Sequence, residues 1–129
     1  GLPGLFHGYH GIVMGVSAGS MNAAHIVYAA PEEPGEAADP HYSRWMNGLG
    51  LTETRILPHY QFIRDHVLDG QKVEDIALAD SKKRHFLALP DGSYILCADG
   101  SETLYGKGWY FADGMMEEIN EDEDVLPLR

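Results

Sequence analysis

The residues best suited to chemistry lie in the segment Gly15-Val16-Ser17-Ala18-Gly19, which fits the pattern Gly-x-Ser-x-Gly. Glycines on both sides of a serine allow a sharp turn from a strand into a helix, which projects the hydroxyl at the carboxyl end of the strand. The amide of Ala18 would then face the oxyanion of an acyl-transfer reaction. A serine that only caps a helix has the same sequence surroundings, so the pattern alone leaves both interpretations open.

A serine nucleophile needs a base within hydrogen-bond distance, and a histidine oriented by a carboxylate is the usual one. Among the seven histidines, His59 is the best candidate because it follows Leu57-Pro58 at the end of a predicted strand. The carboxyl ends of strands are where open α/β sheets gather functional groups. The alternative is a half-buried histidine bonded to the backbone. His25 has no obvious partner, and the others are expected at the surface: His7, His10, His41, His66 and His85.

The elements that must position these residues are short. The apolar residues 12–16, bounded by glycines, predict a buried strand, and the small residues 17–30 predict a helix that ends at Pro31. Residues 31–40 are rich in proline and acids and predict a surface loop. A short helix is predicted over residues 42–47, and a strand that ends at His59 begins at residue 55.

The spacing of apolar residues changes along the second half of the chain, from helical to strand-like. Residues 61–68 predict one or two helical turns, and residues 71–79 predict a helix because Val73, Ile76 and Ala77 have helical spacing. Short β-prone runs separated by Asp-Gly and Gly turns predict hairpins over residues 85–89, 93–98, 102–105 and 107–111. The six acids within residues 117–124 predict a solvated segment.

Composition excludes several classes of function. The chain has 129 residues, a formal net charge of −11 and a pI near 4.8, so we expect one domain over residues 1–129 whose surface repels nucleic acid and anionic lipid. No apolar stretch approaches the roughly 20 residues that cross a bilayer. The single cysteine, Cys97, excludes an intrachain disulfide and favours a cytoplasmic location.

Other residues that could bind a ligand have simpler explanations. A metal between His7 and His10 is not expected because the neighbouring glycines oppose the helix that would align them. Residues 117–124 lack the glycine of a calcium loop. Cys97 is expected to be a buried, inert thiol. Four aromatic residues could line a peptide pocket, although core packing is the expectation for most: Trp45, Trp109, Tyr110 and Phe111.

Several segments together resemble the peptidase E group of serine peptidases, peptidase family S51, which also contains aspartyl dipeptidase and cyanophycinase. They are residues 15–22, the acidic loop 31–40, Gly48-Leu49-Gly50-Leu51 and Leu57-Pro58-His59-Tyr60. The similarity runs from about Tyr9 to Phe111. It implies a flavodoxin-like α/β fold, a three-layer sandwich related to class I glutamine amidotransferases, with a β-hairpin region at its C-terminal end.

The resemblance also implies the roles of the site residues. Ser17 would be the nucleophile, His59 the general base, and Ala18 the donor of an oxyanion contact. The family's acidic residue lies in the loop after the serine-bearing helix, and Glu33 is predicted by its position. Three neighbours remain alternatives for that acid: Glu32, Glu36 and Asp39. The implied activity is hydrolysis of short peptides without a cofactor.

Two features depart from the family pattern. Family members have strands and a Gly-rich oxyanion segment before the serine, whereas only 16 residues precede Ser17 here. We therefore expect this chain to correspond to the C-terminal portion, without the N-terminal strands. The family's aspartyl dipeptidases place a basic residue after the catalytic histidine, where residues 69–75 are mostly acidic here. Arg64 and Lys72 remain candidates for contact with a substrate carboxylate.

Two alternatives to a serine peptidase follow from the same observations. A parallel sheet without its N-terminal strands has an open edge and an uncovered apolar face, which favours a non-catalytic domain that self-associates or binds peptide. A small esterase would use the same serine. The expected partners are a small peptide substrate, for the peptidase, and further copies of this chain in a homo-oligomer.

Overall fold

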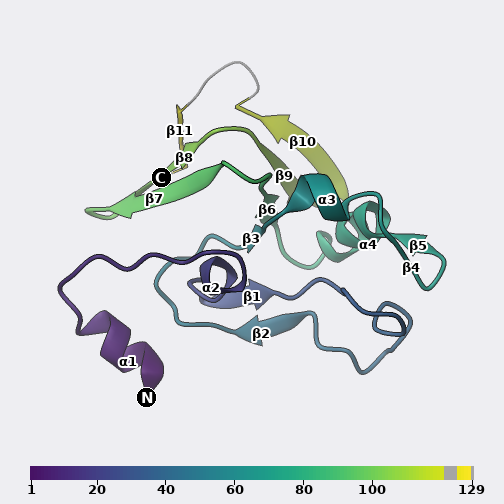
Figure 1. The fold of residues 1–129 in the computed structure, drawn as a ribbon, viewed down its shortest axis with the longest axis horizontal. Coiled ribbons are helices and arrows are strands. Elements are labelled where there is room, and N and C mark those ends of the chain that lie inside the picture. The colour runs from purple at the N-terminus through teal and green to yellow at the C-terminus, as the bar shows by residue number, and fades with distance from the viewer. Residues whose placement is uncertain (121–124, 129) are drawn as a thin grey trace.

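The computed structural model describes residues 1–120 and 125–128. It shows a mixed α/β structure with several sheets and few helices (Figure 1). The helices are α1 (Leu2–His7), α2 (Ala18–Met21), α3 (Tyr60–Ile63) and α4 (Val73–Asp80). The strands are β1 (Ile26–Tyr28), β2 (Trp45–Asn47), β3 (Ile56–Leu57), β4 (Val67–Leu68), β5 (Gln71–Lys72), β6 (Phe86–Ala88), β7 (Tyr94–Ala98), β8 (Ser101–Tyr105), β9 (Gly108–Ala112), β10 (Met115–Ile119) and β11 (Val125–Pro127).

The largest sheet has the strand order β10-β9-β6-β3. Strands β3 and β6 are parallel, with Leu57 opposite Ala88, and the chain between them forms a crossover that contains α3 and α4. Strand β9 is antiparallel to both β6 and β10. Because β3 and β6 run in the same direction, the residues that follow them emerge at one edge of the sheet. Figure 1 shows this edge beside α2 and α3.

Strand β6 is buried on both faces. Phe86 and Ala88 face an aromatic core, in which the ring of Phe86 stacks on those of Tyr28 and Phe111 at centroid distances of 4.4 and 4.9 Å. Leu87 and Leu89 face a second cluster, which includes Leu104 and is covered by the sheet β11-β8-β7. Burial on both faces explains why residues 86–89 form a continuous apolar run rather than an alternating one.

A buried polar network connects the acidic loop 31–40 to the end of α4. The carboxylate of Asp80, which is 7% exposed, accepts hydrogen bonds from the Tyr28 hydroxyl at 2.7 Å and from Arg44 at 3.0 Å. Arg44 also donates to the carbonyl of Ala37 at 3.1 Å. Burial, followed by the adjacent Asp80 carboxylate, raises the pKa of Tyr28, so this phenol stays protonated and donates. The loop is therefore held by the core rather than free.

The predicted strand over residues 12–16 is wrong. No strand pairs with these residues within the described parts of the chain, and Ile12 and Met14 are 90% and 83% exposed. An apolar run becomes a buried strand only where neighbouring strands supply hydrogen bonds and cover its faces.

Of the two helices predicted around the acidic loop, the first is wrong in part and the second is wrong. Helix α2 ends at Met21, and β1 occupies residues 26–28, where the helix was expected to continue. Residues 45–47 form β2 instead of a helix, antiparallel to β1 with Tyr28 opposite Trp45. These two segments contain β-branched and aromatic residues whose burial against the core outweighs local helix propensity.

Most of the predicted elements after residue 50 are confirmed. A strand ends shortly before His59, a helix covers Val73–Asp80, and strands overlap the four ranges predicted between residues 85 and 111. Of the hairpins predicted within these described residues, only β7–β8 forms, because β6 pairs with β9 rather than with β7. The loop over residues 31–40 is also confirmed. Trp109 and Phe111 belong to the aromatic core and Trp45 packs against it, whereas Tyr110 is 38% exposed.

Two further predictions concern the end of the chain. Glu117 and Glu118 are exposed, as predicted, although they belong to β10, while residues 121–124 of the same predicted segment lie outside the described residues. Cys97 is exposed instead of buried, and it lies near the turn of the β7–β8 hairpin. None of the helices in the described residues is long and apolar enough to traverse a membrane.

Candidate active site

Ser17 occupies a sharp turn immediately before α2. Its backbone angles are φ 55° and ψ −122°, a conformation that is strained for a residue with a side chain. The turn is held by the Gly19 amide, which donates to the Val16 carbonyl at 3.0 Å. The Ser20 hydroxyl also donates to the Ser17 carbonyl, at 2.5 Å. This is the geometry that a Gly-x-Ser-x-Gly turn requires to expose a serine hydroxyl.

The two glycines of this turn have different roles. A Cβ on Gly15 would lie 2.7 Å from the Gly19 carbonyl oxygen and 2.8 Å from backbone atoms of Ser20, whereas a Cβ on Gly19 would meet nothing within 4 Å. Glycine is therefore required only at position 15, because the backbone of Gly19 and Ser20 lies too close to leave room for a Cβ there.

We expect Gly15→Ala to open the turn, to destabilise the protein by about 1–3 kcal/mol and to lower any activity of Ser17 by about 100-fold. Gly19→Ala is the matched control, and it should keep the activity and raise the stability by up to about 1 kcal/mol because alanine is the better helix former. Urea unfolding measures the change in stability, and the rate at which a fluorophosphonate labels Ser17 measures the change in activity. Equal behaviour of the two variants would contradict the assigned role of Gly15.

His59 lies two residues after β3, at the residue that precedes α3. It adopts a left-handed backbone conformation with φ 59° and ψ 29°. Its ring contacts two groups, because Nε2 lies 3.0 Å from Ser17 Oγ and Nδ1 lies 2.5 Å from Asp91 Oδ1. With a proton on Nδ1, the ring donates to the carboxylate and accepts from the hydroxyl. The structure thus brings Ser17 and His59 together, as the proposed chemistry requires, and adds Asp91.

Asp91 lies in the turn that follows β6. The Ser93 amide donates to the Pro90 carbonyl at 3.3 Å, and Gly92 has φ 94°, which a type II turn needs at its third residue. Two bonds continue the pairing of β3 and β6 toward the site: Leu89 donates to Leu57 at 2.9 Å, and Tyr60 donates to Leu89 at 3.0 Å. His59 and Asp91 are therefore neighbours because their strands are neighbours.

The carboxylate on His59 is thus not the predicted one. Glu33 and Glu32 are exposed on the loop 31–40, which is fixed by hydrogen bonds from the amides of Gly35 and Ala38 to Asp69 in the β4–β5 turn, at 2.8 and 3.1 Å. The other two alternatives are engaged within the loop: Glu36 accepts from the Glu32 amide and Asp39 from the His41 amide. The prediction failed because the parallel neighbour of β3 is β6, so the residue after β6 meets the histidine ring.

The sequence contains a signal for Asp91 that the prediction missed. Leu89-Pro90-Asp91 repeats the pattern of Leu57-Pro58-His59, with an apolar strand, then Leu-Pro, then a polar residue. Two such strands joined by a helical crossover are expected to lie parallel, and their ends then share one edge of the sheet.

The groups around Ser17, His59 and Asp91 fix the backbone at the site but leave the side chains exposed. Tyr60, next to His59, is fully buried and donates to Glu74 at 2.6 Å, and burial, followed by the hydrogen bond to Glu74, raises the pKa of Tyr60. The side chains of His59 and Asp91 are 44% and 49% exposed. Among the described residues, no acceptor bonds the amide of Ala18, which is therefore free to contact a substrate oxygen.

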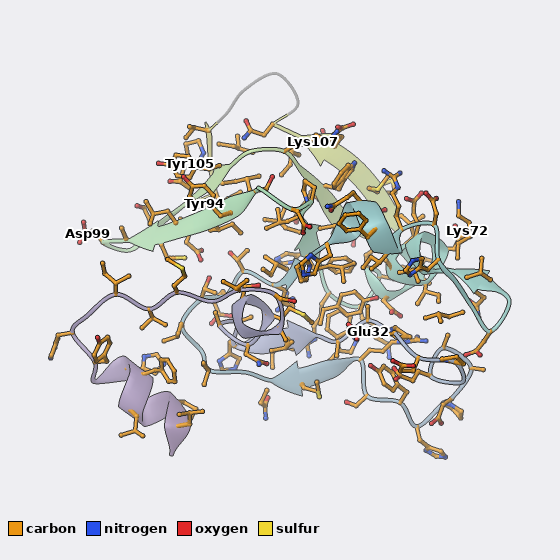
Figure 2. The ribbon with its side chains drawn as sticks, in the orientation of Figure 1. Glu32, Lys72, Tyr94, Asp99, Tyr105 and Lys107 are labelled. Atoms are coloured by element: carbon orange, nitrogen blue, oxygen red, sulfur yellow. The ribbon has the colours of Figure 1, made fainter. Side chains whose placement is uncertain are left out.

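Both cations considered for a substrate carboxylate already have acidic partners. Arg64 lies 3.0 Å from Glu74 and its guanidinium also covers the Tyr60 ring, at 5.2 Å from the centroid. Lys72, on the β4–β5 hairpin at the right of the molecule (Figure 2), lies 3.4 Å from Asp65. Neither side chain is free to bind a substrate without losing an ion pair.

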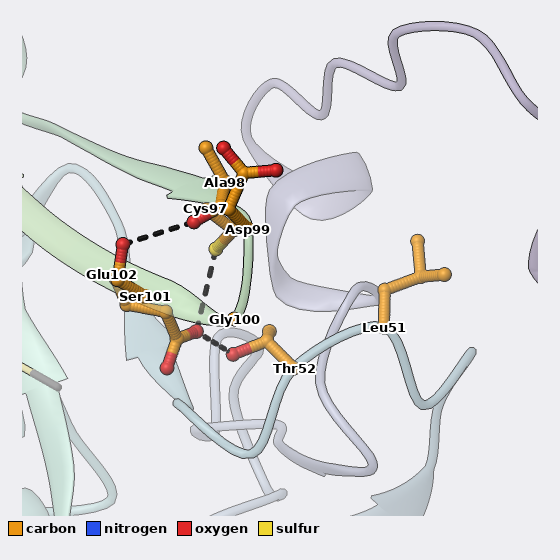
Figure 3. A pocket seen from close by; sticks show the side chains of 8 residues that line it. All are labelled: Leu51, Thr52, Cys97, Ala98, Asp99, Gly100, Ser101 and Glu102. Carbon is orange, nitrogen blue, oxygen red and sulfur yellow. Dashed lines mark hydrogen bonds between the residues drawn. The ribbon is translucent and has the colours of Figure 1, made fainter.

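A separate hollow of about 260 Å³ lies between Leu51-Thr52 and the β7–β8 turn (Figure 3). Its buried acid, Glu102, accepts hydrogen bonds from the hydroxyls of Thr52 and Thr54 and from the Cys97 thiol, the last at 3.3 Å. These bonds attach the β7–β8 hairpin to the segment before β3. Within the described parts of the chain, no group of three or more His, Cys, Asp or Glu residues could hold a metal ion.

Comparison with known protein families gives an independent assignment. The model of peptidase family S51 matches residues 9–105, a segment that contains Ser17, His59 and Asp91. The resemblance seen in the sequence is thereby confirmed. None of the curated proteins matches the chain. Because the family model covers more than half of the residues, the chain belongs to peptidase family S51.

Proposed function

We propose that this protein is a serine peptidase that hydrolyses short peptides, with Ser17 as nucleophile, His59 as general base and Asp91 as the orienting carboxylate. The observation that carries the proposal is the continuous contact from Ser17 Oγ through both ring nitrogens of His59 to Asp91. Three segments separated by 42 and 32 residues supply these groups. Membership of peptidase family S51 supports a hydrolase of the peptidase type.

The geometry permits the usual steps of acyl transfer. As Ser17 Oγ attacks the peptide carbonyl carbon, its proton passes to His59 Nε2, and the carbonyl oxygen becomes an oxyanion that the Ala18 amide can stabilise. Collapse of this intermediate breaks the C–N bond, and Nε2 returns the proton to the leaving amine. Water then hydrolyses the acyl-enzyme by the same proton transfers. Asp91 holds Nδ1–H throughout and stabilises the imidazolium.

The contribution of helix α2 to this site is limited by its length. The helix has four residues, so its dipole is small compared with that of a long helix. We therefore assign the oxyanion contact to the single Ala18 amide. Loss of one such donor typically costs about 100- to 1,000-fold in turnover, which sets the scale of what this amide contributes.

A panel of dipeptides and p-nitrophenyl esters tests the proposed reaction. We expect the protein to release free amino acids from dipeptides, and we do not expect a preference for an N-terminal aspartate because Arg64 and Lys72 are both paired. Turnover of the esters alone would favour a small esterase. Turnover of neither class by the folded protein would contradict the proposal.

Two further proposals, on the type of sheet and on the location in the cell, accompany this function. We propose that the parallel pair β3–β6 with its helical crossover is part of a flavodoxin-like sheet, as membership of the family implies. We also propose a cytoplasmic location, which the single cysteine supports because it offers no intrachain disulfide.

A second candidate function is self-association through the N-terminal segment. Residues 1–31 contain no Asp, Glu, Lys or Arg, although the whole chain carries a net charge of −11. Within this uncharged segment, six apolar residues line a hollow of about 400 Å³: Leu5, Phe6, Tyr9, Ile12, Val13 and Met14. Clustered, exposed apolar side chains are typical of contact sites between proteins.

Sedimentation analysis across a range of concentrations tests this candidate. We expect the wild-type protein to associate and the double variant Ile12→Ser/Met14→Ser to remain monomeric, because the two residues are 90% and 83% exposed. Leu96→Ser is the matched control, because Leu96 is 50% exposed on the β7 edge strand and should not affect association. A wild-type monomer at every concentration would exclude self-association.

A further inference from the structure

Gln61 connects the helix that follows His59 to the turn that presents Asp91. Its side-chain oxygen Oε1 accepts a hydrogen bond from the Asp91 amide at 3.0 Å. Gln61 is half-buried in α3, while Asp91 lies at the surface. The contact therefore runs from a fixed helix to an exposed turn.

The backbone bonds between the two strands stop before Asp91. They join Leu57 to Leu89 and Leu89 to Tyr60, so they fix the chain only as far as Leu89. The turn itself is closed by the bond from Ser93 to Pro90, in which the Asp91 amide takes no part. Gln61 supplies the bond that acts on the backbone of Asp91 itself.

Gln61 and His59 belong to one short, rigid segment. They are separated only by Tyr60, whose buried side chain and hydrogen bond to Glu74 fix the start of α3. A bond from Gln61 to the Asp91 backbone therefore fixes the carboxylate relative to the histidine ring. This matters because the carboxylate is 49% exposed, and water competes for its contact with Nδ1.

We propose that Gln61 is a positioning residue for the reaction, one that keeps Asp91 on His59 Nδ1 by bonding the Asp91 amide. This inference rests on the proposed function of Ser17, His59 and Asp91. Gln61 touches neither the nucleophile nor the substrate in this role, and it acts only through Asp91.

A pair of substitutions separates positioning from folding. Gln61→Met keeps the length of the side chain but removes the acceptor, and we expect kcat to fall about 10- to 100-fold with little change in KM. Gln61→Glu keeps an acceptor and should lose less. Gln71→Met is the matched control because Gln71 is exposed on β5, and its kcat should equal that of the wild type.

The decisive comparison repeats Gln61→Met in protein that already carries Asp91→Ala. If Gln61 acts through Asp91, the second substitution should cost nothing further. Equal losses in both backgrounds, or an unchanged kcat for Gln61→Met, would overturn the inference.

A measurement without turnover keeps this test separate from that of the proposed function. In the Ser17→Ala protein, the Nδ1 proton of His59 should give a low-field NMR signal, which Gln61→Met should shift or broaden and Gln71→Met should not. If the signal changes as expected but no substrate is cleaved, the proposed function fails, and what stands is that Gln61 holds Asp91 on the ring of His59. If peptides are cleaved but Gln61→Met leaves both the signal and kcat unchanged, only the positioning role fails.

Discussion

Ser17→Ala is expected to lower kcat for dipeptide hydrolysis by at least about 10⁴-fold, because it removes the hydroxyl that lies 3.0 Å from His59 Nε2. Alanine can occupy the same turn with similar backbone strain, and the serine side chain is exposed, so the free energy of unfolding should change by less than about 1 kcal/mol. Steady-state kinetics on the best dipeptide, with urea unfolding of the same samples, measures both quantities.

Ser101→Ala provides the control for this substitution. Ser101 is also exposed, and its hydroxyl donates to the Ala98 carbonyl at the β7–β8 turn, at 2.9 Å. Its kcat should match that of the wild type. Retention of wild-type kcat by Ser17→Ala would mean that another group attacks the substrate.

Asp91→Asn is expected to lower kcat by about 10⁴-fold while leaving KM nearly unchanged. Asparagine has the size of aspartate but carries no charge, so it neither stabilises an imidazolium nor enforces a proton on Nδ1. The substitution acts on Ser17 through the 2.5 Å contact between Asp91 and Nδ1. Measurement of kcat and KM on a common dipeptide separates this loss from a loss of substrate binding.

Glu33→Gln discriminates between the acid in the structure and the acid predicted from the sequence. Glu33 is exposed on the loop 31–40, and its removal should leave kcat unchanged. A large loss in Glu33→Gln together with a small loss in Asp91→Asn would restore the predicted Ser-His-Glu arrangement and contradict the triad described above.

The candidate nucleophile and base could be predicted because their signals are local. The turn at Ser17 needs only Gly15 and the chain that folds over it within five residues. The position of His59 needs only a strand followed by Leu-Pro. Each feature is contained in a short window, so the sequence carried enough information to find both residues.

Asp91 could not be placed in the same way because its position depends on strand pairing. Leu89-Pro90-Asp91 has functional meaning only if β6 lies parallel to β3, and that pairing joins residues about 30 positions apart. The family resemblance favoured the loop after the serine helix and directed attention to Glu33. The order of strands in the sheet, rather than any local pattern, decides which carboxylate reaches the ring.

The first 47 residues show the opposite failure, in which local patterns were strong but misleading. The apolar residues 12–16 have the composition of a buried strand, yet Val16 is 74% exposed beside the nucleophile. The segments 26–28 and 45–47 have helix-forming neighbours, yet they pair as β1 and β2. In each case tertiary contacts determine the secondary structure, and these contacts cannot be read from a short window.

Covalent labelling with a fluorophosphonate tests the central claim most directly, because it requires the activated serine but no knowledge of the peptide substrate. Ser17 Oγ would attack phosphorus, fluoride would leave, and the serine proton would pass to His59 Nε2. We expect mass spectrometry to find one adduct, on Ser17, formed at least about 10³-fold more slowly in His59→Ala and in Asp91→Asn. An adduct on another residue, or labelling of Ser17 at the same rate in His59→Ala, would contradict the account.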